Sequence, residues 1–113
     1  MEDRFLQQMK KGVLEMLVLE TVCGGATYGY ELLGRLRERS GGLFALKEGT
    51  LYPLLHTLEK EKLVTSYSKQ TPSGRERKYY RLTGDGLAQL EYKEKEGKLF
   101  SRTVNAVLGY AGM

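Results

Sequence analysis

The chain reads KEGTLYPLLHTLEKEKL from Lys47 to Leu63 and continues directly with VTSYSKQTPSGRERKYYRLT from Val64 to Thr83. The first part spaces its leucines three and four residues apart, which predicts an amphipathic helix. The second part contains two β-favourable runs separated by the turn signal Pro72-Ser73-Gly74. A short helix followed by a β-hairpin is the order in which a winged helix-turn-helix presents a reading helix and a wing to DNA.

Positive charge is concentrated in this predicted wing. The segment Lys69–Arg81 contains five basic side chains and one acid, Glu76, and its net charge of +4 equals that of the whole chain. A basic cluster on a hairpin indicates an anionic partner. The alternative is a solvated hairpin rim, which is common in small β-ribbons.

The remaining sequence predicts a mainly α-helical domain. Four helices are expected, spanning Phe5–Val22, Thr27 or Tyr28 to Arg39, Glu48–Lys62, and a last helix from after Thr83 to about Tyr110. Thr27 and Thr83 are the predicted N-caps of the second and last helices. The fold class is therefore a winged helix-turn-helix with a small β-hairpin, and we expect residues 1–83 to bind DNA and residues 84–113 to form a dimerisation helix.

The third helix is the predicted reading helix. Six residues face away from its leucine stripe, namely Thr50, Tyr52, Pro53, His56, Thr57 and Lys60. A B-form major groove is about 12 Å wide and accepts one helix. The alternative is an exposed face that contacts only water, but an exposed Tyr-Pro pair on a short helix has no packing role visible in the sequence, so we expect DNA contact.

Within the wing, Arg75, Arg77 and Lys78 directly follow Gly74. Arginine in a narrow minor groove gains from the enhanced negative potential there, and cations on phosphates add salt-dependent affinity. Tyr79 and Tyr80 are neighbours on a strand, so they must point to opposite faces, and one of them is expected in the core.

The last helix predicts self-association. Its middle, Glu91–Lys98, is strongly charged and is not expected to pack on the domain, whereas the apolar residues beyond it are Leu99, Phe100, Val104, Val107 and Leu108. An apolar end on a projecting helix indicates burial on a second subunit. The alternative is that the helix folds back on the first helix of its own chain.

Composition argues against several other classes of protein. One cysteine (Cys23) and one histidine (His56) cannot build a His/Cys zinc cluster or an internal disulfide, and neither has an evident catalytic partner, so we expect no cofactor and no enzyme activity. Cys23 is expected in the core. No run approaches the roughly 20 apolar residues of a membrane span, and the charged N-terminus lacks a signal peptide, so the expected location is the cytoplasm.

Three stretches together resemble the signature of PadR-type transcriptional regulators: TYGYELLGRLRERSGG (Thr27–Gly42), EGTLYPLLHTLEKEKLV (Glu48–Val64) and GRERKYYRLTGDG (Gly74–Gly86). The single last helix is similar to that of the short-tailed subgroup. The resemblance implies a homodimer in which this helix packs against the first and last helices of the partner subunit, which adds Leu6 and Met9 to the expected dimer contacts.

The resemblance also implies a repressor on double-stranded DNA, released by a small-molecule effector bound between subunits. The DNA-contacting residues that we expect are Tyr28, Gly49, Thr50, Tyr52, Pro53, His56, Arg75, Arg77 and Lys78. Because the chain contains no tryptophan, a tryptophan-walled drug pocket is not expected. The alternative function is a winged-helix module that binds protein and no DNA.

Overall fold

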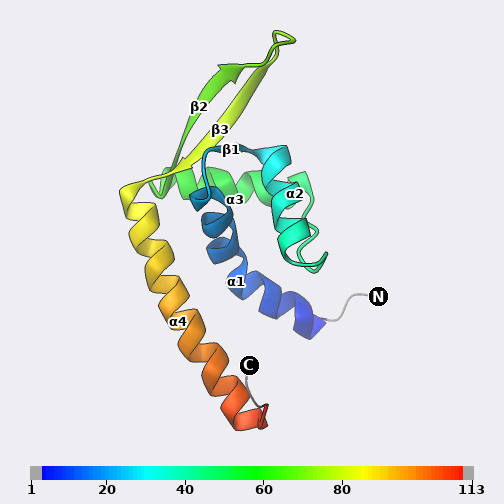
Figure 1. The fold of residues 1–113 in the computed structure, drawn as a ribbon, viewed down its shortest axis with the longest axis vertical. Helices are drawn as coiled ribbons and strands as arrows, with labels where there is room; N and C mark the ends of the chain where they lie inside the picture. The colour runs from blue at the N-terminus through cyan, green and yellow to red at the C-terminus, as the bar shows by residue number, and fades with distance from the viewer. Residues whose placement is uncertain (1–3, 111–113) are drawn as a thin grey trace.

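The computed structural model describes residues 4–110, which form four helices and a three-stranded sheet (Figure 1). In chain order the elements are α1 (Arg4–Cys23), β1 (Thr27–Tyr28), α2 (Gly29–Arg39), α3 (Glu48–Lys60), β2 (Val64–Gln70), β3 (Glu76–Leu82) and α4 (Gly84–Leu108). The predicted winged helix-turn-helix is confirmed, with α2 and α3 as the helix pair and β2–β3 as the wing. The last helix ends at Leu108, two residues before the predicted end.

The sheet contains a strand that the sequence did not reveal. Its order is β1-β3-β2 with antiparallel neighbours, and β1 pairs Thr27 with Tyr80 and Tyr28 with Tyr79. The prediction that Thr27 caps α2 is therefore wrong, because Thr27 is a buried strand residue and the N-cap position is Tyr28. The Thr27 hydroxyl instead donates to the Glu31 carboxylate over 2.8 Å, so it is satisfied inside the domain.

The leucine stripe of α3 forms the centre of the core, as predicted. Leu51, Leu55 and Leu58 are fully buried, together with Val18 and Leu19 from the C-terminal half of α1. Leu32 and Leu36 of α2 complete the same cluster. Because the leucine side of α3 is buried in this cluster, the opposite side of the helix is exposed to solvent.

The start of α4 is attached firmly to the connection between α3 and β2. The Thr83 hydroxyl accepts a hydrogen bond from the Gly86 amide over 2.9 Å, which confirms the predicted N-cap, and it donates to the Lys62 carbonyl over 2.7 Å. Gly86 is buried against Leu63: a Cβ added to Gly86 would lie 2.9 Å from the Leu63 carbonyl carbon and closer still to its oxygen. Because any side chain at position 86 would collide with the Leu63 backbone, only glycine allows the start of α4 to lie this close to Leu63.

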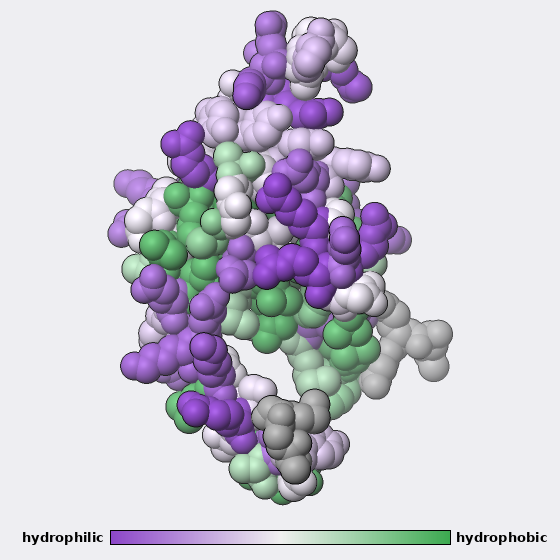
Figure 2. Space-filling model, in the orientation of Figure 1, coloured by the Kyte–Doolittle hydropathy of each residue, from purple (hydrophilic) through white to green (hydrophobic). Residues whose placement is uncertain are grey.

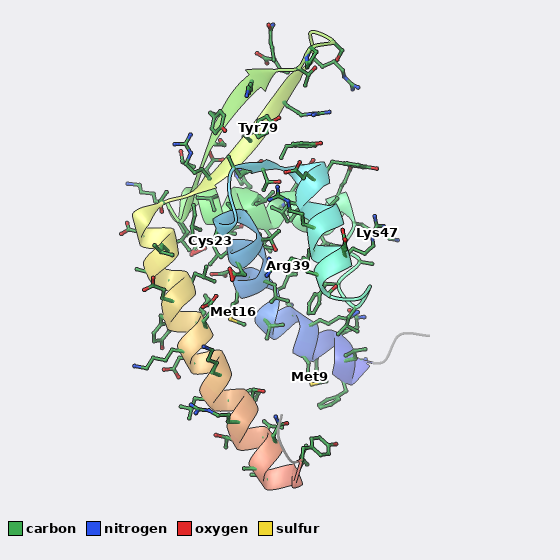
Figure 3. All side chains as sticks on the ribbon, in the orientation of Figure 1. Met9, Met16, Cys23, Arg39, Lys47 and Tyr79 are labelled. Atoms are coloured by element: carbon green, nitrogen blue, oxygen red, sulfur yellow. The ribbon has the colours of Figure 1, made fainter. Side chains whose placement is uncertain are left out.

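The charged middle of α4 packs on α1, so the expectation that it cannot pack on the domain is wrong. Lys93 forms an ion pair with Glu15 at 3.7 Å, and Gly97 lies against Met16, which is on the side of α1 that faces α4 (Figure 3). A Cβ added to Gly97 would lie 3.5 Å from the Met16 methyl carbon, which is an ordinary van der Waals distance. Beyond that contact, the C-terminal half of α4 projects away from the body of the molecule (Figure 1).

Cys23 is exposed at the end of α1, so the prediction that it lies in the core is wrong. Between residues 4 and 110, no helix is long and apolar enough to cross a membrane, and no three His, Cys, Asp or Glu side chains are grouped to hold a metal ion.

Candidate nucleic-acid interface

The outward face of α3 carries the predicted reading residues. Gly49, Thr50, Pro53 and His56 are all exposed, and 41% of the Tyr52 surface is accessible. The helix continues through Pro53, whose carbonyl accepts a hydrogen bond from the Thr57 hydroxyl at 3.1 Å. This face therefore offers hydroxyl, imidazole and apolar groups to a neighbouring molecule.

Tyr52 has a packing role that the sequence did not show. Its ring lies against Gly29 at the start of α2: a Cβ added to Gly29 would lie 2.7 Å from the Cζ and Cε1 atoms of Tyr52. The expectation that an exposed Tyr-Pro pair lacks any packing role is therefore wrong for Tyr52. Part of its ring is held by the domain while the rest remains accessible.

The wing is joined to α3 through Glu59. The Glu59 carboxylate accepts a hydrogen bond from the Ser66 hydroxyl of β2 and pairs with the Lys78 ammonium of β3 at 3.6 Å. The Ser66 hydrogen bond, with a smaller contribution from the Lys78 charge, lowers the pKa of Glu59 below its usual value. The carboxylate therefore stays ionised and holds the base of the wing close to the reading helix.

Tyr79 and Tyr80 point to opposite faces of the sheet, as predicted. Tyr80 is buried, and this burial raises the pKa of its phenol. Tyr79 lies between two other tyrosines in one cross-strand row: its ring packs edge-on against Tyr28 at 5.5 Å between centroids and stacks on Tyr67 at 5.6 Å.

Arginine covers both ends of this tyrosine row. The Arg77 guanidinium lies 4.2 Å from the centroid of Tyr28, and that of Arg81 lies 5.1 Å from the centroid of Tyr67. Both distances suit cation–π contacts. No local pattern in the sequence indicates the row, since it requires the register of all three strands.

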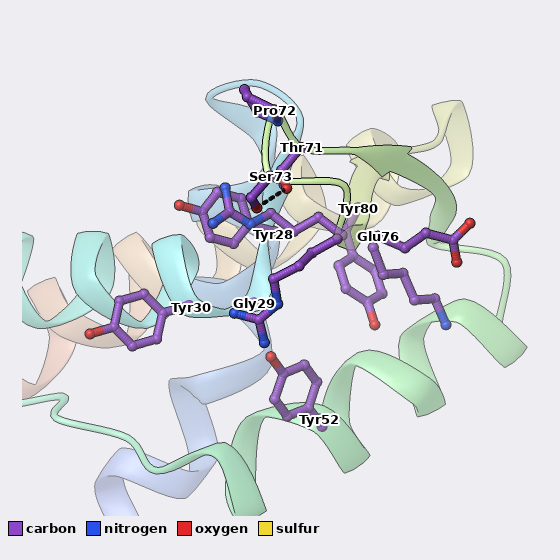
Figure 4. Close-up of a pocket in the computed structure, with 12 residues that line it drawn as sticks. Tyr28, Gly29, Tyr30, Tyr52, Thr71, Pro72, Ser73, Glu76 and Tyr80 are labelled. Atoms are coloured by element: carbon purple, nitrogen blue, oxygen red, sulfur yellow. Dashed lines mark hydrogen bonds between the residues drawn. The ribbon is translucent and has the colours of Figure 1, made fainter.

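A groove of about 900 Å³ opens between the wing, the start of α2 and the reading helix (Figure 4). Five of the nine predicted DNA-contacting residues line it: Tyr28, Tyr52, Arg75, Arg77 and Lys78. The other four, Gly49, Thr50, Pro53 and His56, lie outside its lining, on the exposed face of α3. Gly29 and Tyr30 also line the groove and were missed, although they follow Tyr28 directly in the sequence.

The groove is suited to an anion. Three cationic residues and four tyrosines line it, against a single acidic residue, Glu76. On the face drawn in Figure 2, hydrophilic residues cover the hairpin end of the molecule. Cations with phenol donors beside an exposed helix face fit a phosphate backbone next to a DNA groove.

The predicted dimer residues form a separate surface at the other end of the molecule. On α4, Leu99, Phe100, Val104, Val107 and Leu108 are all exposed, and Phe100 and Val107 reach 71% and 81%. On α1, Met9 is exposed and Leu6 is half-buried. The parts of α1 and α4 that carry these residues lie away from the hairpin (Figure 1).

Comparisons with known proteins agree with this geometry. Residues 18–92 match the model of the transcriptional regulator PadR-like family. A PadR-like transcriptional regulator from Bacillus cereus has a similar structure, with a TM-score of 0.80 and 42% sequence identity over 89% of this chain and 96% of that one. A PadR family regulator from Eggerthella lenta gives a TM-score of 0.82 and 31% identity over 94% of this chain and 90% of that one.

A curated relative extends the comparison at the sequence level. An uncharacterised protein from Lysinibacillus sphaericus is 35% identical over 86 residues, which is 76% of this chain and 79% of the relative. The family match covers α2, the reading helix α3 and the complete wing, together with the end of α1 and the start of α4. The chain therefore belongs to the PadR-like family of transcriptional regulators, which bind DNA.

Proposed function

We propose that this DNA-binding regulator is a repressor that occupies a palindromic operator as a homodimer and is released by a small molecule. The observation that carries the DNA-binding part is the groove itself, where the cations of the wing and Tyr52 of the reading helix lie on one surface. The family match gives no support to the alternative of a winged-helix module that binds only protein.

In this proposal the two halves of the interface have different tasks. The exposed face of α3, with Gly49, Thr50, Tyr52, Pro53 and His56, enters the major groove and reads base edges. Arg75 and Arg77 extend along the flanking minor groove, and Lys78 and Tyr28 contact phosphates. The reading helix supplies sequence preference, and the wing supplies most of the affinity.

The apolar ends of α1 and α4 support the dimer. We propose that residues 1–83 bind DNA and that residues 84–113 form the dimerisation helix. Residues 1–3 and 111–113 of these two segments lie outside the described residues. Leu6 and Met9 of one subunit would then pack on Leu99, Phe100, Val104, Val107 and Leu108 of its partner. An effector bound between subunits would favour a different dimer angle and misalign the two reading helices.

Reversing two charges in the wing, Arg75→Glu with Arg77→Glu, should weaken binding to every duplex. The dependence of log K on log salt should also flatten, by about 0.9 for each phosphate that a subunit no longer neutralises. Fluorescence anisotropy across a salt series measures both quantities. Arg37→Glu with Arg39→Glu is a matched control, since it changes the net charge equally on an exposed part of α2. An unchanged slope in a folded wing variant would reject the wing assignment.

Tyr52→Ala should cost specific binding about 1–3 kcal/mol, the range expected for the removal of one base contact. Binding to random duplex should change much less, because the wing cations remain. The variant should also unfold at a lower temperature, since the ring packs on Gly29. Tyr52→Phe separates the two effects because it keeps the ring. If Tyr52→Ala lowers both affinities by the same factor, Tyr52 contacts phosphate and sequence is read elsewhere on α3.

Selection of duplexes from a random DNA pool by the purified protein tests the function directly. A repressor of this kind enriches an inverted repeat, and we call the enriched duplex the selected operator. A scrambled duplex of equal composition should bind at least about a thousandfold more weakly at physiological salt. A pool that stays random after repeated rounds would contradict sequence-specific binding and favour the protein-only module.

A further inference from the structure

The junction between β1 and α2, Tyr28-Gly29, contacts one DNA-facing side chain from each half of the interface. Arg77 of the wing lies over the ring of Tyr28, and Tyr52 of the reading helix lies against Gly29. We propose that this junction positions both side chains, so that Tyr28 and Gly29 are positioning residues for DNA recognition. The inference rests on the proposed function.

Gly29 receives the Tyr52 ring because it has no side chain. Gly29 is buried, and its backbone is not in the left-handed region, so alanine would be free to adopt its conformation. Space is therefore what glycine provides, since an added Cβ would collide with the Tyr52 hydroxyl and with two ring carbons. An alanine at this position must push the tyrosine away from its observed orientation.

Tyr28 holds Arg77 in a comparable manner. The guanidinium lies 4.2 Å from the ring centroid, and Tyr79 and Tyr67 support that ring from across the sheet. An exposed arginine on a hairpin otherwise samples many rotamers, and ordering it on binding costs free energy. A ring that already fixes the guanidinium at the groove removes part of that cost.

The two contacts involve consecutive residues of the chain. The wing, through Arg77, and the reading helix, through Tyr52, therefore both pack on the same short segment, Tyr28-Gly29. Tyr28 and Gly29 line the groove together with Tyr52 and Arg77 (Figure 4). The Tyr28 ring belongs to the sheet row, whereas Gly29 begins α2. A single peptide unit that need not touch a base thus contacts both the wing arginine and the reading tyrosine.

Gly29→Ala tests the first contact against Gly34→Ala, a control in the same helix where an added Cβ has nothing within 4 Å. Binding to the selected operator should weaken by about tenfold in Gly29→Ala, within the range expected for one base contact. Gly34→Ala should bind as the wild type does. Nuclear Overhauser contacts between the Gly29 α-protons and the Tyr52 ring report the wild-type contact without DNA.

A double-mutant cycle separates positioning from a general loss of structure. If Gly29 acts through Tyr52, then Gly29→Ala should cause no further loss of operator affinity in the Tyr52→Ala background. An equal loss in both backgrounds, or equal affinities of Gly29→Ala and Gly34→Ala, would overturn the assignment of Gly29. Failure of the wild type to discriminate operator from scrambled duplex would instead reject the proposed function, and the Overhauser contacts would still test the positioning.

Tyr28 requires a parallel test. Tyr28→Phe keeps the aromatic ring under Arg77 and should bind the selected operator more tightly than Tyr28→Leu. In the Arg77→Ala background the difference between phenylalanine and leucine should vanish. Equal losses in Tyr28→Phe and Tyr28→Leu would show that Tyr28 acts through its hydroxyl alone, as a phosphate contact, and would overturn its positioning role.

Discussion

Gly86→Ala is expected to lower the free energy of unfolding by about 3 kcal/mol, at the upper end of the usual cost of overpacking. The added Cβ meets the backbone carbonyl of Leu63 and the Leu82 side chain, and a backbone atom cannot move aside as a flexible side chain can. Separation of the two segments would also strain the Thr83 cap, which bonds to the Gly86 amide and the Lys62 carbonyl.

Thermal and urea denaturation followed by circular dichroism measure this loss. A change of this size should lower the melting temperature by roughly 10 °C or more in a domain of this length. Gly84→Ala is the control, because it lies in the first turn of the same helix and an added Cβ has nothing within 4 Å. Equal stability of the two variants would show that α4 does not start against Leu63 as observed.

The second large effect is expected from Phe100→Asp with Val104→Asp. Both side chains are exposed on the projecting half of α4, so the isolated subunit should keep its fold. A dimer would have to bury two carboxylates per subunit, and this cost should yield monomers. Operator affinity should fall by at least about a hundredfold, since two linked half-site contacts become independent.

Sedimentation velocity and anisotropy on the selected operator measure the two outcomes. Ser101→Asp with Asn105→Asp is the matched control, because it adds the same charge at the same spacing on adjacent polar positions of α4. The control should remain dimeric. A monomeric wild type at micromolar concentration, or a dimeric Phe100→Asp/Val104→Asp variant, would reject this surface as the dimer contact.

Local patterns in the sequence were sufficient to predict most of the fold. The leucine spacing of α3, the Thr83 cap and the turn at Pro72-Ser73-Gly74 each depend on a few neighbouring residues, and all three are present in the structure. The opposite directions of Tyr79 and Tyr80 follow from strand geometry alone. The basic wing was also recognisable, since its charges are consecutive in the chain.

Features that depend on distant contacts were not predictable. Strand β1 exists because Thr27 and Tyr28 pair with β3, and the orientation of Tyr52 depends on an empty site at Gly29. The packing of the charged middle of α4 on α1 involves pairs that are far apart in the chain, such as Lys93 with Glu15. Periodicity within one segment contains no information about which residue of another segment lies opposite.

The groove was predicted only in part for the same reason. Arg75, Arg77 and Lys78 were identified by their charge, and Tyr52 by its place on the reading helix. Gly29 was missed because a glycine that makes room for another side chain has no chemical group to indicate its role.

Hydroxyl-radical footprinting of the selected operator tests most directly the claim that two subunits present two reading helices to one DNA face. We expect two protected half-sites related by two-fold symmetry, with centres about one helical turn, or 34–36 Å, apart. A single protected segment without symmetry, or protection that is equal on scrambled duplex, would contradict this claim.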